Sequence, residues 1–284
     1  MKKFENIMLA SDIDSTFIWW GRPDVPERNV ERVRYFVKNG GHFSFSSGRN
    51  HRDIFVAVPP VAEICSMPCV LCNGAFCYDI PTDTVRNPYY LDSDAATEML
   101  HFASSLCGDD TGWRISDAKG FLARSEDKYI ADNMRGLGID VFARFIPEAE
   151  MDGKDYFKMV LTSKNTEKLG RIFEEIQKKF PQFSYTRSSV HIAEVLPLGI
   201  SKATQLKYIK DELTQKYGKM TLVCVGDYDN DIDMLKFADI PMCPENASAP
   251  VKEICKIGLC HCRDGAVGDA VDKIEAMVDG KMKL

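Results

Sequence analysis

The feature that most constrains this chain is an apolar run near its start that ends in two carboxylates. The segment Ile7-Met8-Leu9-Ala10 is followed at once by Ser11-Asp12-Ile13-Asp14. A short apolar run of this kind is typical of a buried strand in a parallel sheet. Open α/β sheets bind their ligands at the carboxyl ends of the strands. Two acids at that place could hold a metal, attack an electrophile or do both, and their burial requires a compensating cation.

Composition and charge narrow the class of protein. The chain has 284 residues, of which 45% are apolar and 27% charged, and its net charge is −6. These values are ordinary for a globular protein, and the length favours two domains. An acidic balance without a basic block disfavours nucleic acid or a membrane as the partner. The apolar stretches are too short for a membrane span or a signal peptide, so we expect a cytoplasmic location. We also expect a monomer or a small homo-oligomer.

The ten cysteines raise the question of a zinc or redox site. Cys69 and Cys72 form a CxxC pair, and Cys260 and Cys262 flank His261. Such spacings can indicate zinc or a redox pair. However, the CxxC pair lies in a strand-like run, and no second CxxC completes a ligand set. We therefore interpret the cysteines as reduced, mostly buried thiols that pack as small apolar side chains.

The order of the expected elements indicates two architectures. Residues 1–83 alternate strands with helices, which favours a parallel sheet covered by helices on both faces. Residues 84–189 instead mix helices with short hairpins. The first pattern returns with a helix that Ser201 caps and an apolar strand at 220–225. We therefore predict an α/β fold, with a Rossmann-like parallel-sheet core of residues 1–83 and 190–284 and an inserted α+β module of residues 84–189.

Four groups of polar residues follow strands or begin a helix in this scheme. In chain order they are Asp12 and Asp14, then Ser47-Gly48, then Lys202, then Asp227 with Asn230 and Asp231. These residues in this order resemble the haloacid dehalogenase superfamily of phosphatases. The insertion, together with Asn73-Gly74-Ala75, resembles the Cof-type sugar-phosphatase branch. The resemblance covers essentially the whole chain, and four motifs in order are far more specific than any one of them.

The resemblance implies a role for each residue. Asp12 is expected to be the nucleophile that forms an aspartyl-phosphate, and Asp14 to protonate the leaving alcohol and then activate water. The expected Mg²⁺ ligands are oxygens of acidic residues, namely Asp12, Asp14 (through its backbone carbonyl), Asp227 and Asp231. The expected phosphate contacts are Ser47, Gly48, Lys202 and Asn230. Phosphate-ester hydrolysis needs up to ~10²¹-fold acceleration, which calls for a covalent route and a metal together.

Some residues have simpler interpretations or depart from the family pattern. The acids from Asp227 onward mimic an EF-hand loop, but Ile232 stands where that loop needs Gly and Ala238 where it needs Glu, so we reject this interpretation. Ser15 stands where the family has Gly. If the backbone there has positive φ, this Ser costs roughly 1–2 kcal/mol. Ser47 replaces a Thr and keeps the hydroxyl.

The inserted module would be a cap that covers the site and selects the leaving group. Its candidate contacts are Arg114, Lys119, Arg124, Arg187 and His191, most of which we expect to be solvated surface. Trp19 and Trp20 are expected to pack rather than to stack on a sugar. The expected function is a Mg²⁺-dependent phosphatase of small phosphorylated metabolites, with sugar phosphates first. Two alternatives stay open: a phosphomannomutase-like phosphotransferase, and a non-catalytic phospholigand-binding protein with a relict site.

Overall fold

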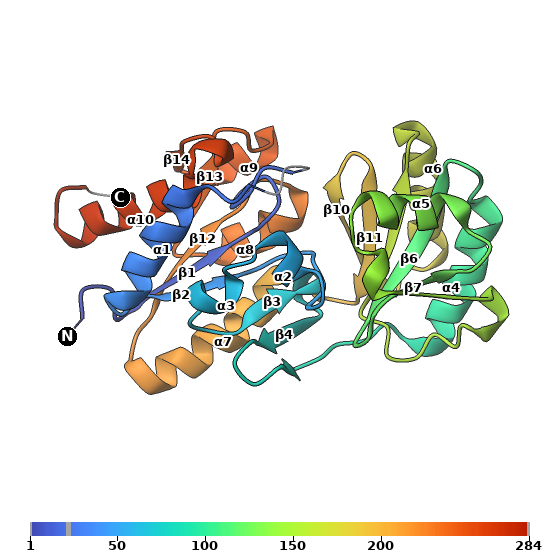
Figure 1. The fold of residues 1–284 in the computed structure, drawn as a ribbon, viewed down its shortest axis with the longest axis horizontal. Coiled ribbons are helices and arrows are strands. Elements are labelled where there is room, and N and C mark those ends of the chain that lie inside the picture. Colours follow the sequence, from blue (N-terminus) through green and yellow to red (C-terminus); the bar gives the residue numbers. More distant parts are fainter. Residues whose placement is uncertain (1, 21–23, 283–284) are drawn as a thin grey trace.

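The computed structural model describes residues 2–20 and 24–282, which form two lobes (Figure 1). One lobe holds a parallel sheet and both ends of the described chain, and the other holds an antiparallel sheet. The predicted α/β fold with an inserted α+β module is therefore confirmed. Within the described residues, no helix has the length and apolar character needed to cross a membrane.

The first lobe, which we call the core, is organised by a parallel sheet with β1 between β12 and β2. Its order is β14-β13-β12-β1-β2. The strands are β1 (Ile7–Ser11), β2 (His42–Phe45), β12 (Thr221–Val225), β13 (Ile240–Pro244) and β14 (Ile257–Leu259). Ser11 lies opposite both Val225 and Phe45, so three strands end at one edge of the sheet. The sequence did not predict β14, because three residues are too few to show a pattern.

Alternation along β1 explains why helices cover both faces of this sheet. Leu9 belongs to the apolar cluster that includes buried residues of α1 and α10, whereas Met8 and Ala10 belong to the cluster that includes those of α7, α8 and α9. Successive side chains of a strand point to opposite faces, so a fully apolar strand must be covered twice. The core helices are α1 (Glu27–Lys38), α2 (Ile54–Ala57), α3 (Val61–Ile64), α7 (Lys202–Tyr217), α8 (Ile232–Phe237), α9 (Ala249–Ile254) and α10 (Ala266–Val278).

A small antiparallel sheet continues the core sheet beyond β2. It consists of β3 (Cys69–Leu71), β4 (Phe76–Asp79) and β5 (Thr84–Arg86), in that order. Ser46 forms a parallel bridge with Val70, so the strand expected at 69–72 does lie beside the second strand. The turn between β3 and β4 is tight, because Cys72 and Asn73 both have positive φ.

The second lobe, which we call the cap, contains a six-stranded sheet in the order β10-β11-β9-β6-β7-β8. Its strands are β6 (Thr111–Asp117), β7 (Gly120–Arg124), β8 (Ala143–Ile146), β9 (Lys158–Ser163), β10 (Phe183–Ser189) and β11 (Ile192–Pro197). Its helices are α4 (Ser93–Leu106), α5 (Lys128–Gly136) and α6 (Thr166–Lys179). Buried residues of α4 and α6 form one apolar cluster with Trp113, Ile115 and Leu161 of the sheet.

Strand pairing passes from the core to the cap, and back, at residues that differ from the domain boundaries predicted from the sequence. A boundary between residues 189 and 190 would divide the hairpin of β10 and β11, which pair with each other and with β9. At the other end, β5 pairs with β4 of the core side. We therefore propose that the cap comprises about residues 87–197. The boundary predicted from the sequence gives β11 to the core, because its alternating pattern fits either lobe. Only its pairing with β9 assigns β11 to the cap.

The cysteines are free thiols in this structure. Most are buried, and the Sγ atoms of Cys65 and Cys69 lie 3.7 Å apart. Among the described residues, the group suited to hold a metal ion consists of carboxylates and includes no cysteine. The burial of most of the thiols agrees with the interpretation of the cysteines as packing residues.

Candidate active site

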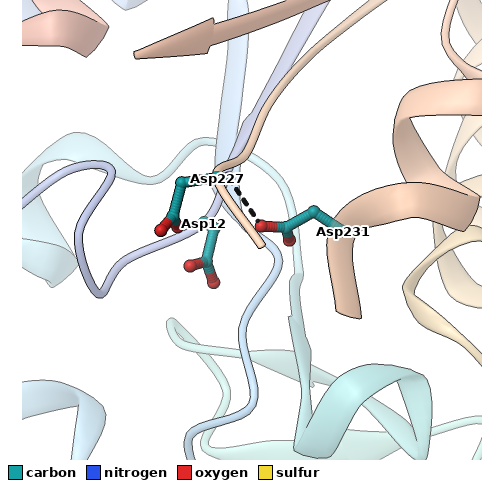
Figure 2. A group of neighbouring side chains, drawn as sticks. All are labelled: Asp12, Asp227 and Asp231. Atoms are coloured by element: carbon teal, nitrogen blue, oxygen red, sulfur yellow. Dashed lines mark hydrogen bonds between the residues drawn. The ribbon is translucent and has the colours of Figure 1, made fainter. Parts of the chain in front are cut away.

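Three carboxylates meet at the carboxyl edge of the core sheet. Asp12 follows β1 and Asp227 follows the neighbouring β12, and the Asp12 amide donates to the Val225 carbonyl at 2.9 Å. Asp231 comes from the turn between β12 and α8. Each residue offers an oxygen within 4.8 Å of the other two, and all three are buried (Figure 2). In the chain, Asp12 is at least 215 residues away from the other two acids, and the fold brings all three together.

Local backbone geometry orients these acids. Asp231 Oδ2 accepts hydrogen bonds from the amides of Asp227 at 2.8 Å and Tyr228 at 3.2 Å. A side chain at Gly226 would place its Cβ 2.5 Å from Asp231, so the turn requires glycine there. Thr16 donates to Asp227 Oδ1 at 2.9 Å. These contacts fix both carboxylates before any ligand arrives.

Lys202 is the buried cation beside these acids. Its ammonium is fully buried and donates to Asp12 Oδ1 at 2.7 Å and to Asp231 Oδ1 at 2.6 Å. It begins α7, whose first turn is held by a reciprocal capping box of Ser201 and Thr204. Gly74 lets the chain approach this helix start, because a Cβ there would lie 2.0 Å from the Ser201 carbonyl oxygen.

The charges of this cluster do not balance within the protein. Burial raises the pKa of Asp12 to about 7 against the opposing effect of Lys202, and the neighbouring Asp231 and Asp14 add to the rise. Burial, with the charges of Asp231 and Asp12, also raises the pKa of Asp227. With all three carboxylates ionised, a single ammonium faces three negative charges, which leaves two of them without a counter-charge. A divalent cation with oxygen ligands would match both the charge and the donor set.

Asp14 lies beside this cluster but faces another partner. Arg49 donates to its carboxylate through Nε at 2.8 Å and Nη2 at 2.7 Å, and reaches Asp53 through Nη1 at 3.3 Å. The side chain of Asp14 is therefore not part of the carboxylate group that could hold a metal. Sequence reasoning missed Arg49, although its position directly after Ser47-Gly48 was a signal for a cation in the phosphate loop.

The loop after β2 is fixed by the neighbouring β3 hairpin. The Ser47 amide donates to Val70, and the Ser47 carbonyl accepts from Asn73, so the loop follows the edge strand. The Asn73 side chain accepts from Asn230 at 3.1 Å and lies against Gly48, where a Cβ would be 3.2 Å from Asn73 Oδ1. Asn73 therefore holds Gly48 and Asn230 in one place.

A cavity of about 440 Å³ lies between the core and the cap, and its core side is lined by Asp12, Asp14, Ser47, Gly48, Arg49, Asp227 and Asn230. Two hydrogen bonds join the cap to the core beside this cavity. Lys158 of the cap donates to the Gly48 carbonyl at 2.6 Å, and Asn73 of the core donates to Glu194 of the cap, which also pairs with Lys158. Asn50 of the core donates to the carbonyls of Asp117 and Gly120 in the β6–β7 turn. The structure is thus a closed arrangement of the two lobes.

Of the cap residues proposed from the sequence, Arg114 lines this cavity. Arg124 pairs with Asp127 and Glu148, and Arg187 lies over the ring of Phe173. Lys119 is exposed, and His191 contacts the Ser163 carbonyl beside a separate cap cavity. Sequence reasoning missed Lys158 of β9 and Glu194 of β11, because the face on which each side chain lies depends on the pairing of these strands with their neighbours.

The loop after β1 contains Ser15 and the two tryptophans for which we have expectations from the sequence. Ser15 has a φ of 60°, so the position that has Gly in the family pattern does require a left-handed backbone. Its carbonyl accepts from Asn246 at 2.7 Å. Trp19 packs against His261 and under Arg263, both of the core, although it also borders the cavity. Its neighbour Trp20 is 44% exposed at the same border.

Comparisons with known proteins agree with this geometry. A family model of haloacid dehalogenase-like hydrolases matches residues 9–271. The Bacillus subtilis protein YkrA, named as a phosphatase, is 27% identical over 252 residues, which are 87% of this chain and 89% of YkrA. The 5-amino-6-(5-phospho-D-ribitylamino)uracil phosphatase YitU of Bacillus subtilis is 22% identical over 253 residues, with the same coverage. The solved structure of the subclass IIB sugar phosphatase BT4131 has a TM-score of 0.79 at 17% identity and covers 94% of this chain and 98% of that one.

Proposed function

Because the chain belongs to the haloacid dehalogenase-like hydrolases, we propose that it is a Mg²⁺-dependent phosphatase of small phosphorylated metabolites that works through an aspartyl-phosphate. The observation that carries this proposal is the buried group of Asp12, Asp227 and Asp231 with a single lysine among them. The phosphatase names of YkrA and YitU support the reaction class. Sugar phosphates are the first substrates to consider, since BT4131 is named as a sugar phosphatase.

In this proposal Asp12 is the nucleophile. Lys202 holds Asp12 Oδ1, which leaves Oδ2 to attack the phosphorus atom. The new bond joins Oδ2 to phosphorus, and the bond from phosphorus to the leaving oxygen breaks. In the second step, water attacks phosphorus and the bond to Asp12 breaks, which releases phosphate and restores the carboxylate.

Asp14 would move the protons of both steps. It gives a proton to the leaving oxygen in the first step and takes one from the attacking water in the second. Arg49 donates two hydrogen bonds to this carboxylate and so orients it at the wall of the cavity.

The residues present fit a Mg²⁺ ion and a phosphate side by side. Asp12, Asp227, the Asp14 carbonyl and Asp231, directly or through water, would hold the ion. Mg²⁺ would reduce the repulsion between the anionic nucleophile and the anionic phosphate. The Ser47 hydroxyl, the Gly48 amide, Lys202 and Asn230 would bind the phosphate oxygens, and each of these residues except the fully enclosed Lys202 lines the cavity.

The test is a phosphate-release assay with Mg²⁺ on p-nitrophenyl phosphate and a panel of metabolite phosphates. We expect turnover in the unaltered protein and a loss of at least about 10⁴-fold in Asp12→Asn, as for removal of a catalytic nucleophile. Asp229→Asn is the matched control, because Asp229 is exposed in the turn that carries Asp231. Equal turnover in Asp12→Asn and the unaltered protein would remove the proposed nucleophile, and isomerised hexose phosphate without free phosphate would favour a mutase.

A further inference from the structure

The cap presents one face of its sheet to the active site. In the register of β6 and β9, Arg114 lies opposite Val160 and Ser116 lies opposite Lys158. These four residues line the cavity, as do Ile192 and Glu194 of β11. The residues between them belong to the apolar cluster with α4 and α6, namely Trp113, Ile115, Met159, Leu161, Ala193 and Val195. The strand period of two therefore separates a packing face from a ligand face.

Arg114 is the unusual member of the ligand face. It is only 8% exposed, and its Nε is buried without a hydrogen-bond partner among the described residues. Its guanidinium carbon lies 5.8 Å from the centre of the Phe121 ring, and the charges of Glu194 and Asp53 act on it without forming an ion pair with it. Burial lowers the pKa of Arg114, although an arginine stays protonated at any physiological pH. Arg114 is thus a buried cation that forms no ion pair with the described residues.

The other cations that line the cavity are paired. Lys158 has Glu194, whose second oxygen also accepts from Ser188 and Asn73. Arg49 has Asp14 and Asp53. The two acids whose charges reach Arg114 are thus each paired with another cation. A buried charge without an ion pair is unfavourable, so a guanidinium kept in this state at a ligand cavity indicates that the ligand supplies the paired anion.

Most of the remaining cavity lining on the cap side is apolar. The apolar residues are Phe121, Leu137, Ile139, Val160, Val190 and Ile192 of the cap and Trp19 of the core, while Ser116, Ser188 and Ser189 of the cap add three hydroxyl groups. The cavity volume of about 440 Å³ lies in the range of sites that hold small organic ligands. An apolar wall fits a hydrocarbon or aromatic section better than a ring of hydroxyl groups, which would need hydrogen-bond partners there.

We propose that Arg114 binds a second anionic group of the substrate, so that the preferred substrates are phosphate monoesters whose leaving group joins an apolar section to a carboxylate or a second phosphate. This proposal rests on the proposed function, because it places the reacting phosphate at Asp12. The carboxylate and the second phosphate share the chemistry that a guanidinium recognises, namely two oxygen acceptors in one plane.

Binding of phosphonates tests the proposal without turnover, because their carbon–phosphorus bond is not hydrolysed. Benzylphosphonate is compared with its 3-carboxy and 4-carboxy derivatives and with 1,4-xylylene diphosphonate, by calorimetric titration of the full chain in Mg²⁺. We expect at least one second anion to tighten binding about 10- to 100-fold, the usual range for hydrogen bonds to a charged group. The carboxylate and phosphonate arms distinguish the two sources of the anion.

Three variants test whether Arg114 causes the gain in affinity from the second anion. Arg114→Met should lose the gain from the second anion and bind benzylphosphonate as before, whereas Arg114→Lys should keep part of the gain. Arg135→Gln is the control, since Arg135 is an exposed cap arginine outside the cavity. The ratio of the dissociation constants of benzylphosphonate and a ligand with a second anion does not change when a variant contains less folded protein. The melting temperature should also be unchanged or raised in Arg114→Met, because an unpaired buried charge is removed.

Failure of this proposal is distinct from failure of the proposed function. If benzylphosphonate binds but no second anion tightens its binding, the role of Arg114 is overturned while the phosphate site stands. A gain that persists in full in Arg114→Met overturns it as well. If none of the phosphonates binds in Mg²⁺, both proposals fail together.

Discussion

The edge of the core sheet and the ligand face of the cap sheet both bury charge, but they do so differently. At the core edge, Lys202 is shared by Asp12 and Asp231, and Arg49 is shared by Asp14 and Asp53. On the cap face, Lys158 is paired, whereas Arg114 lies over an aromatic ring and forms no ion pair within the described part of the chain. Cations with partners hold the structure together, and a cation without one is free to recognise a ligand.

The largest effect should follow removal of the shared lysine of the core. Lys202→Met leaves Asp12 and Asp231 buried without their common partner. We expect the free energy of unfolding to fall by about 3–5 kcal/mol, as when one member of a buried ion pair is deleted. Urea denaturation measures this, with Lys207→Met as the control, because Lys207 is an exposed lysine of the same helix. Equal stabilities of the two variants would show that the core acids do not need Lys202.

The paired lysine of the cap should behave like Lys202 and unlike Arg114. Lys158→Met leaves Glu194 buried with only Asn73 and Ser188, and we expect a loss of about 3 kcal/mol. The double variant Lys158→Met with Glu194→Gln should recover much of it, because no unpaired charge remains. Arg114→Met should cost nothing. Urea denaturation of these variants measures the free energy of unfolding. If Arg114→Met loses as much of it as Lys158→Met, the distinction between paired and unpaired cations is wrong.

A divalent ion should stabilise the core edge. Its binding to the folded protein alone adds about 2.7 kcal/mol when free Mg²⁺ is 100 times its dissociation constant. We expect the melting temperature to rise with Mg²⁺ and to return on addition of a chelator. Asp227→Asn should weaken the response, because it removes one of the three carboxylates, whereas Asp229→Asn should keep it. The same response in both variants would place the ion elsewhere.

The core was easier to predict from the sequence than the cap. Apolar runs that end in acids showed both the strands and the edge at which Asp12 and Asp227 meet, because parallel strands end on one side. Ser201 was found because a helix start has its own local signal, whereas Lys202 was singled out only by its place among the four motifs of the resemblance. For the strands and for Ser201, a short stretch of sequence carries the information.

The cap site depends on pairing between distant strands, and local patterns do not carry it. The face on which Lys158 lies cannot be assigned from its own strand, since its neighbours on β6 and β11 are about 40 residues away on either side. The hairpin of β10 and β11 was divided for the same reason. Arg49 was overlooked because a single arginine in a loop looks like solvated surface until Asp14 is placed beside it.

The smallest effect concerns backbone strain, which also differs between the two lobes. Among described residues other than Gly, Asn and Asp, positive φ occurs at Ser15 and Cys72, both in core loops beside the site. Ser15→Gly should relieve this strain, less the entropy that Gly adds to the unfolded chain, and so stabilise the protein by about 0.5–1 kcal/mol. Ser15→Ala keeps the Cβ and should give no gain, so the difference between the two variants in urea isolates the backbone. If Ala stabilises as much as Gly, the hydroxyl rather than the φ of 60° is the unfavourable feature, and the core edge carries no stored strain at this position.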